Sequence, residues 1–271
     1  MSDRLEILIS AVNKAVDELP GKMKIETDAV IVNQVPDVDG SGADKDEMIV
    51  AQSGICKVLT RHAKGVGLSR NMALDTASHE IIHFGDDDIV YDEGYSQKIV
   101  DEFDKHPEAD ILLFNVKAQP GRETYWNEDF AKITWKNYGR YPAYAIAARR
   151  EKLLRAGVRY SLLFGGGAEF MNGEDSLFLH DCLKAGLSMY RTPVALGHEL
   201  SGESTWFKGY TEKFFFDRGV LYHFLYGNLA KIFGFRYLLK NSTKMCKEMG
   251  LFKCYGLLAK GVNHGKKIKA R

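Results

Sequence analysis

Three acidic residues in a row, Asp86, Asp87 and Asp88, follow residues 80–84 after a single glycine, and residues 80–84 form an apolar segment typical of a buried strand. Open α/β sheets bind ligands at the carboxyl ends of their strands, so this position favours a functional site. Adjacent carboxylates repel one another, and a hard divalent cation such as Mg²⁺ or Mn²⁺ relieves that repulsion and bridges to phosphates. Alternate residues of an extended segment share a face, so Asp86 and Asp88 are expected to act together. A solvated acidic turn is the structural alternative.

A glycine-rich, basic loop precedes that strand, because residues 64–74 read KGVGLSRNMAL. Glycines let a backbone approach a phosphate, and a helix N-terminus favours an anion. Lys64 and Arg70 are therefore candidate contacts of a diphosphate, Arg70 through its planar guanidinium. A plain connection with a solvated arginine is the alternative.

Two further candidates lie later in the chain. Glu174 and Asp175 open a helical segment, where carboxylates also serve as caps. As a functional group, Asp175 could accept the proton of an attacking hydroxyl while Glu174 orients the acceptor. His198 could complete a metal site begun by carboxylates, although a lone histidine is more often structural.

Residues 37–42, DVDGSG, look like the start of a calcium-binding EF-hand loop. The twelfth position of that loop requires a glutamate, and here it is Met48. We therefore predict a surface loop.

A sheet with intervening helices is expected to position these side chains. Apolar, β-branched runs predict strands at 5–12, 28–32, 48–51, 80–84, 110–116, 144–148 and 189–195. Helical patterns fall at 13–19, 68–77, 96–105, 151–156 and 175–185. This alternation is typical of an α/β fold with a mostly parallel sheet flanked by helices.

The composition is that of a folded globular protein, with 45% hydrophobic and 27% charged residues among 271. Neither a zinc-like spacing of the four cysteines nor a long apolar N-terminal segment is present, which predicts an intracellular protein with reduced thiols. Residues 205–271 contain 14 Lys and Arg but 3 Asp and Glu, which leaves a net charge of −10 on the rest. An acidic body could hold a cation, and a basic tail could meet an anionic surface.

The basic tail also has an apolar pattern. One helical stripe is predicted from side chains that recur at three- and four-residue steps, namely Leu221, Phe224, Leu225, Leu229, Ile232 and Phe233. Polar residues interrupt it too often for a membrane-spanning helix. Two interpretations remain open: an aromatic-rich, basic helix on an anionic membrane surface, or a helical cover that packs on the preceding α/β domain.

Taken in order, four segments resemble glycosyltransferase family 2, the inverting transferases of the GT-A fold, over about residues 5–203. They are LISAVN, DAVIVNQ, KGVGLSRNMALDTASHEIIHFGDDDI and FGGGAEFMNGEDSLFLHDCLKAG. The chain looks like the bacterial enzymes that build surface polysaccharides. The resemblance implies a GT-A catalytic domain over 1–204, with a nucleotide-sugar half at about 1–95 and an acceptor half at about 96–204. A helical extension would follow over 205–271.

The resemblance also implies a role for each candidate residue. The nucleotide-sugar contacts would be Ser10, Ala11, Val12, Asn33, Lys64, Arg70, Asp86 and Asp87. The metal ligands would be Asp88, Asp86 and His198. Asp175 matches the catalytic base, with Glu174 beside it, and the loop 165–167 would shape the acceptor site. The chain departs from the family at Asn33, where an aspartate is common, and at Ile89, where the acidic motif often continues.

The function that the resemblance implies is metal-dependent transfer, with Mn²⁺ or Mg²⁺, of a sugar from a nucleotide diphosphate to an acceptor hydroxyl. UDP is the expected nucleotide. The basic, aromatic-rich tail adds two expectations. The acceptor would be a lipid-linked saccharide, and the protein would lie peripherally on the inner face of the membrane. The alternatives are a nucleotidyltransferase, disfavoured because no glycine-rich motif follows residues 5–12, and a non-catalytic subunit of the same fold. The acidic body argues against nucleic acid as a partner.

Overall fold

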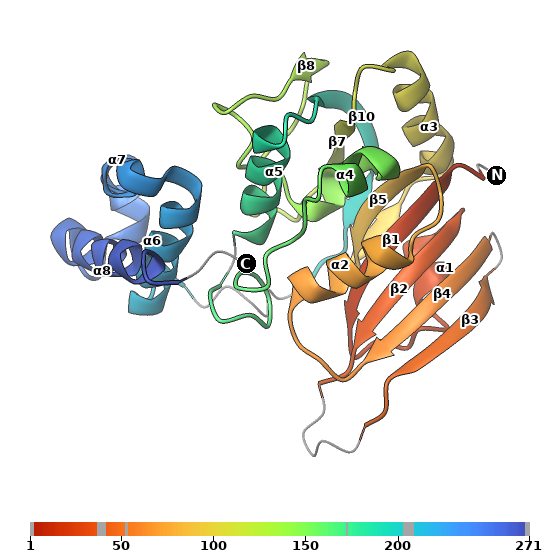
Figure 1. Ribbon diagram of the computed structural model, residues 1–271, viewed down its shortest axis with the longest axis horizontal. Coiled ribbons are helices and arrows are strands. Elements are labelled where there is room, and N and C mark those ends of the chain that lie inside the picture. Colours follow the sequence, from red (N-terminus) through yellow and green to blue (C-terminus); the bar gives the residue numbers. More distant parts are fainter. Residues whose placement is uncertain (1–2, 37–41, 52–53, 172, 203–208, 269–271) are drawn as a thin grey trace.

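The computed structural model describes residues 3–36, 42–51, 54–171, 173–202 and 209–268 (Figure 1). A mixed sheet with helices on its faces forms the larger part of the molecule. Three helices, α6, α7 and α8, form a bundle at one end of its longest axis. The predicted surface loop at 37–42 falls almost entirely outside the described residues.

The sheet has the strand order β3-β4-β2-β1-β5-β9-β7-β10-β6, with β8 paired to β10. Its central strands β4, β2, β1 and β5 are parallel, as are β7 and β10, whereas β3, β6, β8 and β9 run antiparallel to their partners. The strands are β1 (Leu5–Val12), β2 (Asp28–Gln34), β3 (Lys45–Ala51), β4 (Gly54–Arg61), β5 (Ile81–Asp86), β6 (Ile89–Tyr91), β7 (Ile111–Lys117), β8 (Ala131–Lys132), β9 (Ile146–Arg149) and β10 (Met189–Glu199). The predicted α/β class, a sheet of mostly parallel strands flanked by helices with further helices at the C-terminal end, is confirmed.

The helices are α1 (Leu19–Met23), α2 (Val66–Thr76), α3 (Tyr95–Lys105), α4 (Arg150–Arg155), α5 (Glu174–Lys184), α6 (Glu212–Tyr226), α7 (Ala230–Met245) and α8 (Leu251–Gly265), with 3-10 turns η1 (Ala143–Ala145) and η2 (Gly227–Leu229). Successive residues of β1 face opposite sides of the sheet, and both sides are covered by an apolar core. Leu8 packs in the core that contains Leu74 of α2, and Ile7 packs in the core that contains Phe103 of α3.

Two expectations about individual elements are wrong, and strands β4, β6 and β8 were not predicted. The helix expected at 13–19 is absent. Helix α1 instead begins at Leu19, and Pro20 lies in its first turn, where a proline costs no hydrogen bond. Strand β4 was not predicted, since Lys57, Thr60 and Arg61 interrupt its apolar pattern. The single apolar stripe is broken at Gly227, so it belongs to two helices.

The bundle has its own apolar core, which contains Phe215, Leu238 and Leu258. A second cluster joins the bundle to the sheet domain, because Val220 and Leu221 of α6 pack with Phe164, Phe170 and Leu177. The predicted boundary at 204/205 lies outside the described residues, so the division into two domains stays a prediction. Among the described residues, none of the helices combines the length and the apolar composition that crossing a membrane requires.

Candidate active site

The carboxyl ends of β1, β2 and β5 form one edge, because the three strands are parallel and adjacent. Ser10 of β1 lies opposite Val32 of β2 on one side and opposite Asp86 of β5 on the other. Asn33 lies one residue further, opposite Ala11. The predicted nucleotide contacts of the first two strands therefore share an edge with the first carboxylate of the acidic triplet.

Asp87 and Asn33 both hold the segment that follows β1. The Asp87 carboxylate accepts a hydrogen bond from the Val12 amide at 3.2 Å and forms an ion pair with Lys14 Nζ at 3.3 Å. The Asn33 side chain accepts from the Lys14 amide and donates to the Lys14 carbonyl, each at 3.1 Å. These contacts fix the rim of the predicted nucleotide pocket and place the Lys14 ammonium beside it.

The glycine-rich loop is held against the same edge. Gln34 Nε2 donates to the Gly65 carbonyl at 3.1 Å, and Ser69 Oγ donates to Ser10 Oγ at 3.0 Å. Lys64 at the start of the loop is exposed. The loop is thus anchored on β1 and β2, with one lysine directed to solvent.

Arg70 of α2 is buried among carboxylates from two distant parts of the chain. Its Nη2 lies 3.0 Å from Asp86 Oδ1, and its Nη1 lies 2.8 Å from Asp175 Oδ1 and 3.6 Å from Glu174 Oε1. The guanidinium also lies over the Tyr160 ring, 5.0 Å from its centroid, and that ring stacks on Phe178 of α5. Arg70 thereby joins the end of β5 to the start of α5.

Asp175 experiences two opposing electrostatic influences. Burial raises the pKa of its carboxyl above the usual value, and the ion pair with Arg70 acts in the opposite direction. About a fifth of the side chain remains exposed, so a reactant can reach it. A carboxylate with a raised pKa and access to a reactant is suited to accept a proton near neutral pH.

The glycine loop 165–167 lies between the basic loop and the start of α5. The amide of Val66 donates to the carbonyl of Gly166 at 2.9 Å. A Cβ on Gly165 would lie 2.6 Å from Val66 and 2.8 Å from the Glu174 carboxyl carbon, and its φ of 102° is in the left-handed region. Only glycine allows the two loops to approach this closely.

Asp88 lies among carboxylates with no ion-pair partner in the described part of the chain. Burial, followed by Asp86, Glu199 and Asp87, raises the pKa of Asp88 to about 7. Glu199 itself forms an ion pair with Arg122 at 2.8 Å and accepts a hydrogen bond from the Gln119 backbone amide at 3.0 Å. An added positive charge would therefore be most stabilising beside Asp88.

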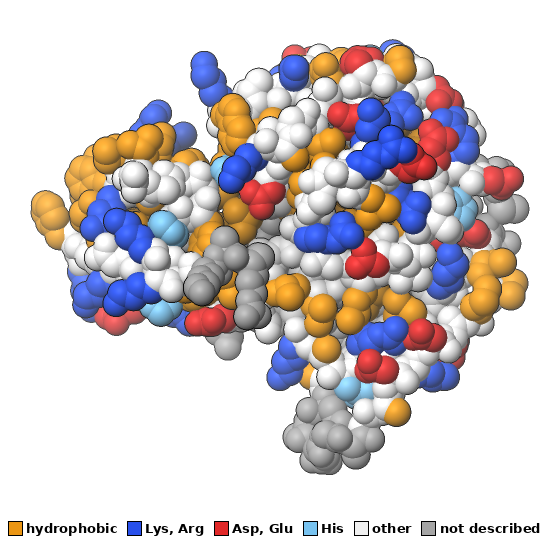
Figure 2. Space-filling view, in the orientation of Figure 1, with side chains coloured by type: hydrophobic (Ala, Val, Ile, Leu, Met, Phe, Trp, Pro, Cys, Tyr) orange, Lys and Arg blue, Asp and Glu red, His pale blue; other side chains and the backbone are white. Residues whose placement is uncertain are grey.

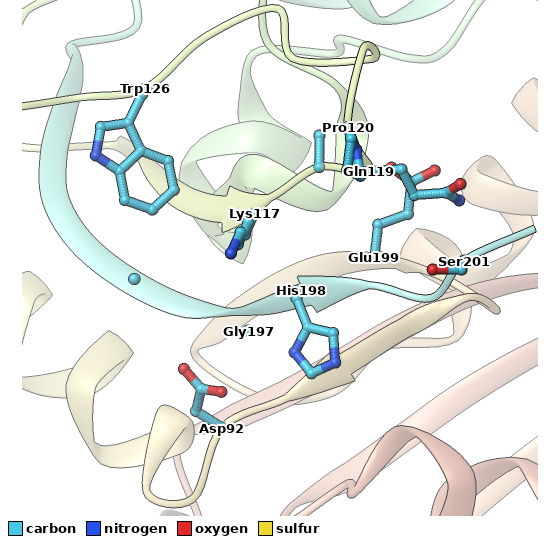
Figure 3. A pocket seen from close by; sticks show the side chains of 11 residues that line it. Asp92, Lys117, Gln119, Pro120, Trp126, Gly197, His198, Glu199 and Ser201 are labelled. Atoms are coloured by element: carbon cyan, nitrogen blue, oxygen red, sulfur yellow. The ribbon is translucent and has the colours of Figure 1, made fainter.

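His198 lies in β10, opposite Val90 of β6, and its side chain is exposed. It lines a cavity of about 430 Å³ with Asp92, Lys117, Trp126 and Glu199 among others, whereas Asp86, Asp88 and Asp175 are not part of that lining. Figure 3 shows His198 on the side of β10 toward Asp92 and Glu199 on the opposite side. The histidine thus faces a neighbouring cavity.

The donor atoms near Asp88 fit a divalent cation in part. Asp86 and Asp88 supply carboxylate oxygens, which Mg²⁺ and Mn²⁺ prefer, and a diphosphate can complete such a shell. Within the described ranges, however, no three His, Cys, Asp or Glu side chains are grouped closely enough to hold a metal ion. The two carboxylates therefore fit a metal that is shared with a substrate, and His198 as a third ligand stays a prediction.

The structure brings most of the predicted residues together, and it adds some that the sequence reasoning missed. Asp86, Glu174 and Asp175 meet at Arg70, while Ser10, Ala11, Val12, Asn33 and Asp87 line the adjacent edge. The missed residues that complete the site are Lys14, Gln34, Ser69, Tyr160 and Glu199. Gln34, Ser69 and Glu199 each adjoin a predicted residue in the sequence, whereas Lys14 and Tyr160 had no such local signal.

The chain is similar to known glycosyltransferases in sequence and in fold. Residues 30–161 match the family model described as glycosyl transferase family 2. Among solved structures, S. aureus TarS 1–349 in complex with UDP-GlcNAc aligns with a TM-score of 0.61 at 16% identity, covering 90% of this chain and 74% of TarS 1–349. The same protein in complex with UDP gives a TM-score of 0.59 at 18% identity, with 90% and 73% covered.

Identities this low show a shared fold, here GT-A. None of the curated protein sequences matches the chain. The match of residues 30–161 to the model of glycosyl transferase family 2 identifies the protein as a glycosyltransferase.

Proposed function

We propose that the enzyme is a metal-dependent, inverting glycosyltransferase that moves a sugar from a UDP-sugar to a saccharide hydroxyl in the synthesis of a bacterial cell-surface polysaccharide. The family match supports transfer from a nucleotide-sugar. The choice of UDP is supported by TarS, whose structures contain UDP or UDP-GlcNAc.

The observation that carries the proposal is the position of Arg70 between two carboxylates. Asp86 lies at the carboxyl end of β5, where the donor is proposed to bind, and Asp175 lies at the start of α5. Because one guanidinium contacts both, the proposed donor site and the proposed base are held at a fixed separation. Such positioning is a large part of catalysis when two substrates must react.

In the reaction, the acceptor hydroxyl gives its proton to the Asp175 carboxylate as its oxygen bonds to the anomeric carbon. The bond from that carbon to the diphosphate oxygen breaks, and its electron pair leaves with the nucleoside diphosphate. One displacement from the opposite face inverts the anomeric configuration. Glu174, beside the base, is proposed to orient the acceptor hydroxyl.

The donor is proposed to lie along the edge formed by β1, β2 and β5. Ser10, Ala11, Val12 and Asn33 border the base and ribose, while the rim cations Lys14 and Lys64 attract the diphosphate. Asp86 and Asp88 would hold Mn²⁺ or Mg²⁺, which neutralises charge on the leaving diphosphate. Asp87 keeps the segment after β1 in place through Val12 and Lys14.

The acceptor is proposed to be a lipid-linked saccharide, and the enzyme to act in the cytoplasm in peripheral contact with the inner face of the membrane. The support is the basic C-terminal segment, whose Val220 and Leu221 pack with Phe164, Phe170 and Leu177, the last of these on the helix that carries the proposed base. A membrane-bound acceptor would then be delivered close to α5.

Product analysis tests the reaction class. The enzyme is incubated with Mn²⁺ and a panel of UDP-sugars, and the nucleotide products are separated. Release of UDP supports the transferase. A nucleotidyltransferase would release no UDP, but with added pyrophosphate it would convert a UDP-sugar to UTP and a sugar 1-phosphate. Unchanged donors, with or without candidate acceptors, would favour a non-catalytic nucleotide-sugar-binding subunit and contradict the proposal.

A further inference from the structure

Helix α7 exposes an apolar and basic face along its whole length. The exposed side chains Ile232, Phe233, Arg236, Leu239 and Lys240 recur with the helical period and so share one side. The opposite side is buried against the rest of the bundle through Ala230, Gly234 and Leu238. We call this set of exposed side chains, with Leu229 just before it and Lys244 near its end, the α7 face.

The α7 face differs from an ordinary solvated helix surface in its apolar content. Ile232 is 66% exposed, Leu229 52% and Leu239 50%, so three large apolar side chains project within eleven residues. Figure 2 shows hydrophobic side chains gathered over the part of the bundle where α7 lies, with Lys and Arg beside them. Contiguous exposed apolar surface of this kind marks an interaction site.

The charge around the α7 face has one sign. Residues 218–247 contain six Lys or Arg and no Asp or Glu. Within the described residues, none of Arg236, Lys240 and Lys244 forms an ion pair. The surface therefore offers apolar side chains for insertion and cations for anionic groups.

We propose that the α7 face docks the enzyme on an anionic lipid bilayer. Helix α7 would lie in the plane of the interface, with Leu229, Ile232 and Leu239 among the acyl chains and Arg236 and Lys240 at the phosphates. Lysine and arginine stems can bury their methylenes while their charges reach the headgroups. The inference specifies the membrane contact within the proposed function and does not depend on the transfer reaction.

Flotation of the full chain with vesicles tests the proposal, in the absence of donor and acceptor. Vesicles of phosphatidylcholine with about 30% phosphatidylglycerol are compared with pure phosphatidylcholine, at low and high NaCl. Binding is expected on the anionic vesicles alone, and roughly tenfold weaker at 0.5 M NaCl because salt screens the headgroups.

Two pairs of variants locate the contact. Arg236→Glu with Lys240→Glu is expected to weaken vesicle binding about 25-fold or more, since each basic residue near the surface contributes about fivefold. Its control is Lys105→Glu with Lys152→Glu, which changes the net charge equally on α3 and α4.

Ile232→Ser with Leu239→Ser is expected to weaken binding at least about tenfold. Its control is Met48→Ser with Val50→Ser on exposed positions of β3, at the opposite end of the molecule (Figure 1).

Binding of UDP to all four variants, measured by calorimetry, shows that the site is intact and separates this inference from the transferase reaction. Wild-type protein that binds anionic vesicles without binding UDP would sink the UDP-sugar assignment and leave the docking face standing. Equal loss in the α7 variants and in their controls would overturn the proposal. So would equal binding to neutral vesicles, or self-association that Ile232→Ser with Leu239→Ser abolishes without any vesicle binding.

Discussion

The edge of the sheet around Arg70 and the α7 face both depend on charge, but they use it in opposite ways. At the edge, a buried guanidinium contacts Asp86 at the end of β5 and the adjacent Glu174 and Asp175 at the start of α5, two parts of the chain far apart in sequence. On the α7 face, exposed cations from one helix lie beside exposed apolar side chains. Buried charges must be paired by the fold, whereas exposed charges act through a local pattern. The buried ion pairs fix the positions of the side chains in the candidate site, whereas the exposed side chains of the α7 face are available to a partner.

Replacement of Arg70 should have the largest effect. Arg70→Met leaves three acidic side chains without their cation, and a buried pair broken this way costs about 3–5 kcal/mol of unfolding free energy. Thermal or urea unfolding measures the loss. The control is Arg159→Met, which removes an exposed ion pair with Asp75 and should cost less than about 1 kcal/mol.

If Arg70→Met does not fold, Arg70→Lys keeps the charge but loses the planar fork that reaches Asp86 and Asp175 together. Turnover should then fall at least about tenfold with the fold retained. The contrast with α7 would be removed if Arg70→Met kept wild-type stability and Arg70→Lys kept wild-type turnover. The buried ion pairs of Arg70 would then contribute no more than an exposed ion pair.

The proposed base is the next most sensitive position. Asp175→Asn keeps the size of the side chain but cannot accept the hydroxyl proton, so turnover of the UDP-sugar should fall about 10²–10⁴-fold. UDP affinity should change little, because the proton transfer takes no part in donor binding. Asp181→Asn on the same helix α5, away from Arg70, is the matched control and should retain activity. A wild-type rate for Asp175→Asn would place the base elsewhere.

Contact between the sheet domain and the helical bundle that carries the α7 face can be tested at Gly173, just before α5. Its φ of 115° is in the left-handed region, and a Cβ there would overlap Leu221 of α6. Gly173→Ala should therefore cost about 2 kcal/mol or more through strain and overpacking. Gly186→Ala, also at positive φ but with open space around it, should cost less. Equal melting temperatures for the two variants would mean that the bundle does not constrain α5.

The smallest expected effect is a gain in stability at Asp88. Its pKa in the folded protein, about 7, lies above the ordinary 3.8, so the folded state binds this proton more tightly than the unfolded state. Ionisation therefore lowers stability as the pH rises from 3.8 to about 7, and the loss is complete above that.

Without metal, Asp88→Asn should raise the unfolding free energy at pH 8 by on the order of 1 kcal/mol, which is about 2 °C in Tm. The gain should disappear near pH 4. The same variant should lose metal-supported UDP binding. Destabilisation at pH 8, with EDTA present, would show that Asp88 is not crowded by its acidic neighbours.

The two regions also differ in how far the sequence could predict them. Strands β1 and β5 and helices α2 and α5 were found close to their observed bounds, because their apolar periods are regular and short turns flank them. The acidic triplet was recognised because its residues are adjacent. The pairing of Arg70 with Asp175 was not, since 105 positions separate them and only tertiary packing brings them together.

Polar residues within a strand and a glycine that ends a helix explain the other elements that the sequence analysis missed. Lys57, Thr60 and Arg61 hid β4, whose charged side chains occupy its half-buried face. Gly227 divides the tail into α6 and α7, so the apolar residues on either side of it do not share a face. The basic character of the tail, in contrast, depends on composition alone and could be read directly.

Calorimetric titration of UDP tests the central claim most directly, with Mn²⁺ and then with EDTA, for the wild type and for Asp88→Ala. The account predicts binding by the wild type with Mn²⁺, and much weaker binding with EDTA or in Asp88→Ala. A folded wild-type protein that binds none of UDP, GDP, dTDP and CDP, with or without metal, would contradict it.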